Sequence, residues 1–258
     1  MYVLGNKKIL NNKGIAIVGT RDCTKYGKNI SFKFSKELTQ KGFNIISGLA
    51  LGIDTYAHLG NVQINMENSK SIGKTIAVLG CGIDELYPKQ NKILAKQILK
   101  TGGCIISEYP NGTKPNKANF PQRNRIISGL AESIIVVEAG ERSGAIITAN
   151  LALEQGKEIF AVPGDITKKQ SIGTNKLIKD FAKLVTSPED IIKNYEFLHK
   201  IELEKPEEKE EENEILKLIK EDPINIDDIV KLSNKNIKEI ISEITILELD
   251  GKIERLPG

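Results

Sequence analysis

The chain has 258 residues, of which 40% are hydrophobic and 28% charged, and its formal net charge is +3 at pH 7. This balance excludes an intrinsically disordered, collagen-like or coiled-coil protein, and the uncharged apolar runs fall far short of the roughly 20 residues needed to cross a bilayer. The cysteines Cys23, Cys81 and Cys104 are far apart, and the chain has only two histidines to join them, which indicates a reduced, cytoplasmic protein with neither a disulfide framework nor a metal site.

From Ile15 onward, short β-branched runs that end in small residues alternate with helical stretches. The predicted strands are Ile15–Gly19, Phe43–Gly48, Thr75–Gly80, Cys104–Tyr109, Ser133–Ala139 and Glu158–Gly164. The predicted helices are Lys28–Lys41, Ile53–Glu67, Asn91–Thr101, Arg123–Leu130 and Gly144–Gln155. Runs that are apolar throughout favour strands buried on both faces, with helices as the crossovers of a parallel sheet. Residues 1–200 are therefore predicted to form a doubly wound, mostly parallel α/β domain.

The composition changes at Ile201. Residues 201–214 are a Glu/Lys run around Pro206, which is typical of a linker. Residues 215–258 are predicted to form three short helices, and Ile237, Ile240, Ile241, Ile244 and Leu247 give the third helix, Asn234–Asp250, an apolar stripe. With Lys252–Leu256 as a wing strand, this segment is predicted to be a small winged-helix domain.

The small net charge conceals two parts of opposite sign. Residues 1–200 hold 28 Lys and Arg against 17 Asp and Glu, a net charge of +11, whereas residues 201–258 hold 9 against 17, a net charge of −8. A basic first domain suggests an anionic partner, although lysine-rich composition alone can produce the same number. The acidic second part suggests a different task.

Polar clusters fall where the predicted strands end, which is where ligands bind in open α/β sheets. Glycines let a ligand approach the backbone, hydroxyls donate to phosphate oxygens, and arginines offer a forked cation. We therefore expect an anion-binding site without catalytic residues, formed by Gly19, Thr20, Arg21, Ser47, Gly48, Gly52, Phe120, Arg123, Asn124, Arg125, Ser143, Gly144 and Thr148. Phe120 could equally stack on a base or belong to the core, and the glycines could serve tight turns alone.

Other polar residues in these clusters have structural explanations. Asp54 is expected to cap a helix more readily than to touch a ligand, and His58 to be a packed, hydrogen-bonded residue. No nucleophile, base and orienting acid emerge as a set. The Gly73-Lys74-Thr75 segment lacks the first glycine of a P-loop and precedes a strand, and no G-x-G-x-x-G is present. ATP hydrolysis and standard NAD binding are therefore disfavoured, and no cofactor is expected.

Nine segments in order closely resemble the DprA (Smf) family of DNA-processing proteins. They are Ile15–Arg21, Tyr26–Gly27, Ile45–His58, Thr75–Pro88, Ser107–Pro110, Phe120–Leu130, Val136–Ala139, Ser143–Ala149 and Ala161–Gly164, and the tail 213–258 resembles that family's C-terminal winged helix. The resemblance implies a Rossmann-like domain that binds single-stranded DNA, forms a homodimer, and protects and loads incoming strands with RecA recombinase during natural transformation.

Two departures from the family pattern stand out. Many members carry an N-terminal helical domain, whereas this sequence begins almost directly at the Rossmann-like part, so the contribution of that domain is expected to be absent. Leu51 stands where the family usually has an arginine in the second glycine loop, which removes one phosphate contact and predicts lower DNA affinity.

Two other functions remain as alternatives. The related phosphoribohydrolases release bases from nucleotides on a similar fold, but the segment Ser143–Thr148 lacks the acidic residue of their pattern. The winged helix could itself read duplex DNA, but its third helix carries Glu239, Glu243 and Glu248, which phosphates would repel. A protein-binding or a passive stabilising role fits this acidic domain better.

Overall fold

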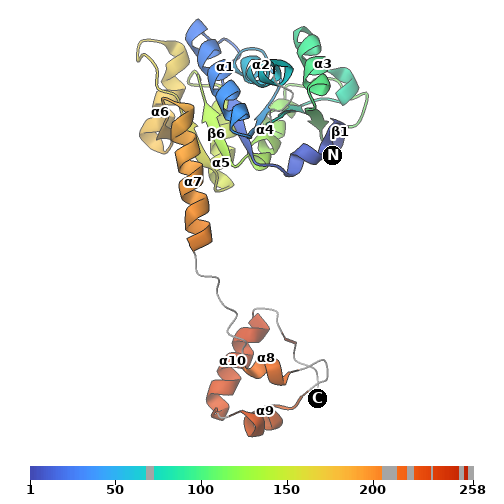
Figure 1. Cartoon of the computed structure of the whole chain (residues 1–258), viewed down its shortest axis with the longest axis vertical. Coiled ribbons are helices and arrows are strands. Elements are labelled where there is room, and N and C mark those ends of the chain that lie inside the picture. Colours follow the sequence, from blue (N-terminus) through green and yellow to red (C-terminus); the bar gives the residue numbers. More distant parts are fainter. Residues whose placement is uncertain (68–72, 205–213, 220–223, 234, 250–252, 255–258) are drawn as a thin grey trace. The chain divides into compact units, whose positions relative to one another are not determined.

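The structure is a computed structural model, and it describes residues 1–67, 73–204, 214–219, 224–233, 235–249 and 253–254 (Figure 1). The chain divides into two compact units, Met1–Tyr195 and Glu196–Gly258. Each unit is described by itself below.

Among the described residues, the first unit contains one eight-stranded sheet with the order β1-β5-β4-β3-β2-β6-β7-β8. β1 runs antiparallel to β5, and the other neighbouring strands are parallel. The strands are β1 Tyr2–Gly5, β2 Gly14–Val18, β3 Asn44–Ser47, β4 Thr75–Leu79, β5 Cys104–Ser107, β6 Ser133–Val136, β7 Glu158–Ala161 and β8 Lys183–Leu184. The prediction of a doubly wound, mostly parallel α/β fold is therefore confirmed.

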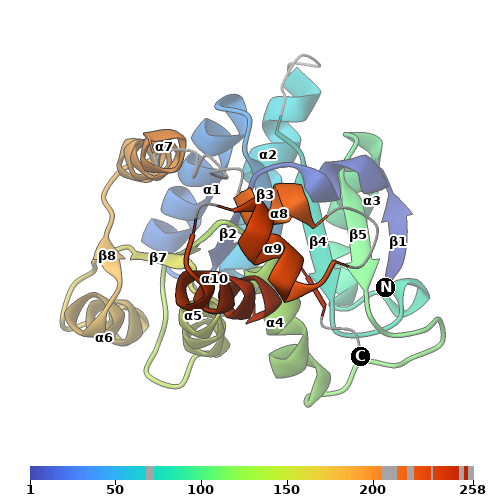
Figure 2. The ribbon, with the colours of Figure 1, turned by 90° about the horizontal axis from the view of Figure 1, so that it is seen from below.

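Helices cover both faces of this sheet (Figure 2). One face carries α1 (Lys25–Gln40), α2 (Ile53–Glu67), α3 (Lys92–Lys100) and α7 (Pro188–Glu204), and the other carries α4 (Asn119–Leu130), α5 (Gly144–Glu154) and α6 (Ile172–Asp180). The 3-10 turns are Lys7–Asn11, Ile83–Glu85, Lys89–Asn91 and Lys169–Ser171.

The strand β2 shows why the predicted strands had to be apolar throughout. All five of its residues are buried, with Ile15 and Ile17 in the core beneath α1 and α2, and Ala16 and Val18 in the core beneath α4 and α5. Successive side chains of a strand point to opposite faces, so a strand covered on both faces needs apolar residues at every position.

The strand order identifies one special place in the sheet. From β2 the chain moves outward through β3, β4 and β5 on one side, and then returns to place β6 against the other edge of β2. The loops after β2 and β6 therefore diverge to opposite sides, which opens a crevice at the carboxyl ends of these two strands. Ligands of doubly wound folds bind at this kind of position.

The structure also corrects several predicted element boundaries. The predicted strands overran the real ones by one to three residues because their terminal glycines and polar residues lie in the loops. Helix α4 begins at Asn119, four positions before the predicted start at Arg123. The exposed strand β1, the two-residue strand β8 and the helices α6 and α7 had no predicted counterpart.

In the second unit, α8 (Glu214–Leu218), α9 (Ile226–Leu232) and α10 (Ile237–Leu249) enclose a small core of Ile215, Ile229, Ile240, Ile244 and Leu247. Ile237 and Ile241 of the predicted apolar stripe are instead about half exposed. Helix α7 continues to Glu204 and α8 starts at Glu214, so both ends of the predicted linker are helical. The rest of that linker and most of the predicted wing strand lie outside the described residues.

Candidate functional site

A pocket with a volume of about 560 Å³ opens at the carboxyl ends of β2 and β6. Most of its lining comes from three segments that are far apart in the sequence: the loop after β2, the first turns of α4 and the start of α5. Ala50 and Asp54, near the start of α2, also line it. The three segments contribute Gly19, Thr20, Arg21, Phe120, Arg123, Asn124, Ser143, Gly144 and Thr148, all of which the sequence had placed in one site. Lys117 and Tyr87, which the sequence reasoning missed, also line the pocket.

The start of α5 presents a helix N-terminus to the pocket. Ser143 is its N-cap residue, and the hydroxyl of Ser143 accepts a hydrogen bond from the amide of Ala145 at 3.3 Å. The carbonyl oxygen of Gly144 accepts from the Thr148 hydroxyl and from the Asn124 amide, both at 3.3 Å. These bonds hold α4 and α5 together at the pocket, and the positive end of the α5 dipole favours an anion there.

The aromatic ring of Phe120 lies within cation–π distance of two guanidinium groups. The Cζ atom of Arg21 is 5.4 Å from the ring centroid and the Cζ atom of Arg123 is 6.0 Å from it. Phe120 is only partly buried and lines the pocket, so the expectation that it could be a core residue does not describe its position. Cation–π contact keeps the Arg21 charge at the pocket wall.

Arg123 is buried, whereas the sequence suggested a forked cation that is open to a ligand. Its side chain is only 4% exposed, and Nη1 donates to the carbonyl oxygen of Gly48 at 2.7 Å and to that of Val78. Its Nε donates to Asn124 Oδ1 at 3.3 Å. Burial lowers the pKa of Arg123 to about 10, opposed by the negative charge of Asp54, so the group stays cationic at neutral pH. Arg123 thus fastens the ends of β3 and β4 beneath the pocket.

The loop between β3 and α2 is held by side chains from two directions. The Oδ2 atom of Asp54 accepts from the amides of Gly48 at 3.1 Å and Ala50 at 3.4 Å. The Nδ2 atom of Asn91 donates to the carbonyl oxygens of Leu49 at 2.9 Å and Ala50 at 3.2 Å. Asp54 is the second residue of α2, lines the pocket and binds amides of the loop before the helix, so it organises that loop and does not cap the helix as expected. Burial raises the pKa of Asp54, and the Arg123 charge opposes that rise.

Two glycines of this loop serve close packing. Gly52 has φ +79°, and a Cβ there would lie 2.4 Å from the carbonyl oxygen of Thr20, which is backbone that cannot move aside. A Cβ on Gly48 would lie 2.6 Å from the Arg123 guanidinium. Neither glycine lines the 560 Å³ pocket, so neither makes the phosphate contact that was expected. Their role is to let the loops and Arg123 pack closely together.

Ser47 and His58 are also structural. The fully buried hydroxyl of Ser47 donates to the carbonyl oxygen of Ile17 at 2.7 Å, which corrects the expectation that it faces a ligand. The hydroxyl of Thr75 donates to the carbonyl of Ile45 at 2.8 Å, so it accepts from His58 Nδ1 at 2.7 Å. Burial, assisted by the Arg123 charge, lowers the pKa of His58 to about 3 and keeps its imidazole neutral.

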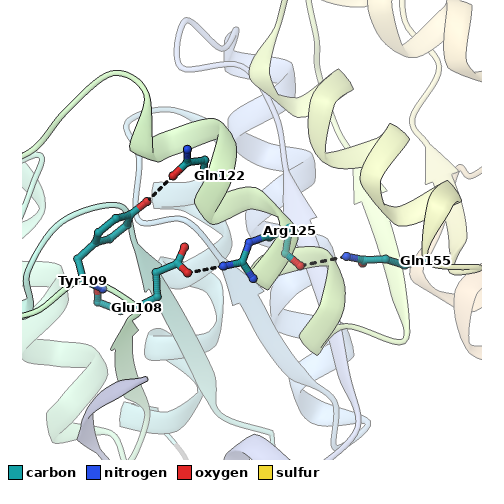
Figure 3. A network of polar contacts seen from close by, with 6 residues as sticks. Glu108, Tyr109, Gln122, Arg125 and Gln155 are labelled. Atoms are coloured by element: carbon teal, nitrogen blue, oxygen red, sulfur yellow. Dashed lines mark hydrogen bonds and ion pairs between the residues drawn. The ribbon is translucent and has the colours of Figure 1, made fainter.

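Arg125 does not line the pocket, contrary to the sequence-based expectation (Figure 3). Its guanidinium forms an ion pair with Glu108, which follows β5, and its carbonyl oxygen accepts from Gln155 Nε2 at 3.2 Å. One turn earlier in α4, Gln122 accepts from the Tyr109 hydroxyl at 3.2 Å. This side of α4 is therefore bound to the segment after β5, because α4 turns Phe120 and Arg123 toward the pocket and Arg125 away from it.

The described residues hold no cluster of three or more His, Cys, Asp and Glu side chains suited to a metal ion. None of the described helices has both the length and the apolar character that spanning a membrane requires.

Comparisons with known proteins identify the family of both units. A family model described as DNA recombination-mediator protein A matches residues 1–196, and one described as DprA winged helix domain matches residues 202–258. The chain is 37% identical to Protein Smf of Escherichia coli, over all of this chain and 70% of that protein. It is 44% identical to the DNA processing protein DprA of Bacillus subtilis, over 74% of this chain and 62% of that protein.

Two solved structures are similar to the first unit. DNA processing protein A from Streptococcus pneumoniae is 43% identical with a TM-score of 0.67, and the match covers 74% of this chain and 64% of that one. DNA processing protein A from Helicobacter pylori, whose structure describes a single-stranded DNA binding mode, is 31% identical with a TM-score of 0.66, and the match covers 75% of this chain and 85% of that one.

Proposed function

This chain belongs to the DNA recombination-mediator protein A family, and from that premise we propose that it binds single-stranded DNA in the pocket at the ends of β2 and β6. One observation carries the proposal. Arg21, Lys117 and the N-terminus of α5 meet at one pocket of about 560 Å³, together with hydroxyl and amide side chains. This combination suits a phosphate group, and a Helicobacter pylori relative is described as binding single-stranded DNA.

The pocket residues divide into two groups by their environment. Arg21, Lys117, Thr20, Asn124, Ser143 and Thr148 contact the phosphates, while Phe120 lies beside them as a surface on which a base stacks. Arg123, Ser47, Gly48 and Gly52 act by holding the loops that form the pocket wall. Phosphate contacts carry no sequence information, so this part of the binding is expected to be the same for single strands of any sequence.

The chain acts as a mediator rather than an enzyme. Two acidic residues, Asp22 and Asp54, line the pocket. Asp54 is buried and accepts from two loop amides, whereas Asp22 lies exposed on the loop after β2. A phosphoribohydrolase reaction would need an acid and a base held in place in the pocket, and His58, which is neutral and buried, does not line it. Incubation with nucleoside monophosphates should therefore release no free base, and release that is lost in the Arg21→Ala variant would favour the enzyme.

The wider role follows from the family. We assign to the chain the protection of incoming single strands and their loading with RecA recombinase during transformation, with two copies pairing so that two basic pockets face one strand. Two linked pockets raise avidity without new contacts when one strand spans both. The chain spans 62% and 70% of the lengths of two of its curated relatives, so these activities are proposals for the whole protein.

A nuclease-protection assay tests the proposal. A labelled single-stranded oligonucleotide should be protected by the wild-type protein, and protection should be lost at the same protein concentration in the Arg21→Ala variant. Addition of the wild-type protein should also speed the assembly of RecA on single strands. Equal protection by both proteins would place the binding site elsewhere.

A further inference from the structure

A second, smaller pocket adjoins the phosphate pocket. Its volume is about 40 Å³, and the two pockets share five lining residues, so a nucleotide in the larger pocket lies next to the smaller one. Space of this size holds a group of about one or two heavy atoms but no whole base. The lining consists of Gly48, Ala50, Leu51, Tyr87, Pro88 and Phe120 together with the two arginines Arg21 and Arg123.

Two aromatic rings border this small pocket. The ring centroids of Tyr87 and Phe120 are 5.7 Å apart and the ring planes are inclined by 41°. Phe120 is fixed from behind, because a Cβ on Gly80 would come within 2.9 Å of its ring. Tyr87 is 43% exposed. The pair therefore combines a fixed ring with an accessible one, which is the arrangement that receives an unstacked base.

Leu51 gives the small pocket its apolar character. Its side chain is 39% exposed and carries no donor for a phosphate, although it follows a loop whose backbone is otherwise held by polar contacts. The loop is stiff. Asp54 accepts from the amides of Gly48 and Ala50, on either side of Leu49, and Asn91 donates to the carbonyl oxygen of Leu49 itself, which has φ +55°. Leu51 is therefore carried on a stiff loop at the wall of the small pocket, and its side chain favours an apolar group there.

We propose that the small pocket is a base-binding subsite selective for thymine, in which a base stacks on Tyr87 and Phe120 and its C5 methyl enters beside Leu51 and Pro88. The inference rests on the proposed binding of single-stranded DNA, because the adjoining phosphate occupies the larger pocket. Thymine carries an apolar methyl at the position where uracil has hydrogen, and proteins recognise it by apolar contact. The size of the pocket matches that methyl group.

The test compares three single-stranded oligonucleotides of equal length. They are oligo-deoxythymidine, oligo-deoxyuridine and an abasic strand with the same phosphates, and binding to the full-length protein is measured by fluorescence anisotropy. Burial of one methyl predicts that oligo-deoxyuridine binds about fourfold more weakly than oligo-deoxythymidine at every salt concentration. Loss of stacking predicts a further weakening of at least about fivefold for the abasic strand.

Two variants assign the preference to this subsite. Leu51→Arg should fill the small pocket, abolish the thymine preference and steepen the salt dependence. Ile93→Arg is its matched control, because this substitution adds the same charge at a position outside the lining of both pockets. Ile93 lies on α3 and is 73% exposed. Tyr87→Leu should reduce the difference between thymine and abasic strands, whereas Tyr2→Leu, on the exposed strand β1, should not.

A fluorescence measurement distinguishes stacking of a base at the subsite from binding of the strand through its phosphates alone. The chain contains no tryptophan, so Tyr87→Trp introduces a single tryptophan at the subsite, whose emission can be excited selectively over that of the remaining tyrosines. Its emission should be quenched by oligo-deoxythymidine and much less by the abasic strand.

The outcomes separate the two proposals. Equal affinity for thymine and uracil strands, with no change in Leu51→Arg, would overturn the subsite and leave DNA binding in place. Absence of binding to all three strands would overturn both. Thymine preference that persists in Leu51→Arg would place base selection elsewhere and overturn the subsite.

Discussion

The side chain of Arg123 in α4 donates a 2.7 Å hydrogen bond to the main-chain carbonyl of Gly48, which lies 75 positions earlier in the chain. Nη1 of Arg123 makes this bond, and it also donates to the main-chain carbonyl of Val78 near the end of β4. One buried cation thus fastens two parallel strands to the helix that carries Phe120. The floor of the pocket and its wall are therefore one connected structure, and Arg123 contributes both to stability and to the shape of the site.

Arg21→Ala and Arg123→Ala should separate these two contributions. Arg21→Ala should weaken single-strand binding and make its salt slope shallower by about 0.7, with little change in the melting temperature. Arg123→Ala should also weaken binding, but it leaves the carbonyl oxygens of Gly48 and Val78 without this donor, so the free energy of unfolding should fall by about 1 to 3 kcal/mol. Anisotropy titrations and denaturant unfolding measure the two effects. An Arg123→Ala protein of unchanged stability would contradict the structural role.

Arg125→Ala should have little effect on DNA binding. Arg125 is paired with Glu108 on the side of α4 that faces away from the pocket lining, and an exposed charge at a distance is screened by salt. The affinity of the Arg125→Ala protein for single strands should differ from that of the wild type by less than about twofold, and the salt slopes of the two proteins should match. A loss as large as that in Arg21→Ala would show that the strand crosses this side of α4.

The neutral state of His58 predicts a stability that falls in acid. The unfolded histidine binds a proton below about pH 6.5, whereas the folded one stays neutral until about pH 3. Between these values the unfolded chain binds more protons, so the free energy of unfolding should decrease by up to about 1.4 kcal/mol per pH unit as pH falls.

His58→Gln removes this titration and serves as the comparison. Its unfolding free energy should depend less steeply on pH than that of the wild type. The raised pKa of Asp54 acts in the opposite direction in both proteins, so it cancels in the difference. Denaturant unfolding in a series of buffers gives both slopes, and identical slopes would mean that the pKa of His58 is the same in the folded and unfolded states.

The acidic second unit should not hold DNA. The residues from 201 to the end carry a net charge of −8, which repels phosphates. A protein that ends at Glu204, where α7 ends, should therefore bind single strands as tightly as the full chain or slightly more tightly. Circular dichroism and light scattering on the shortened protein serve as controls for folding and assembly. A folded, shortened protein that had lost binding would make the second unit a DNA contact.

The extent of sequence-based prediction differs between the fold and the site. Uniformly apolar strands such as β2 indicate a sheet that is covered by helices on both faces. The central strands of the sheet and most of the helices could therefore be predicted. The strand β1 could not, because all four of its residues are exposed and it pairs only with the distant β5. Helices α6 and α7 lie beyond the motif-bearing segments and offer no polar cluster at a strand end to mark them.

Within the site, sequence position predicted which segments meet but not which way each side chain turns. Arg123 and Arg125 are two positions apart on α4, and that spacing sends one into the pocket wall and the other to Glu108. Lys117 and Tyr87 lie in loops with no periodicity, so nothing in their spacing placed them at the pocket. The role of Asn91 depends on a contact with a loop about 40 positions away.

The central claim is that the pocket at the ends of β2 and β6 binds single-stranded DNA through its phosphates. The most direct test is a titration of the full chain with single-stranded and duplex oligonucleotides of one sequence, repeated over a series of salt concentrations with wild type and Arg21→Ala. The account predicts tighter binding to the single strand and a salt slope that becomes shallower by about 0.7 in the variant. Duplex binding of equal or greater strength, or a slope that Arg21→Ala leaves unchanged, would contradict it.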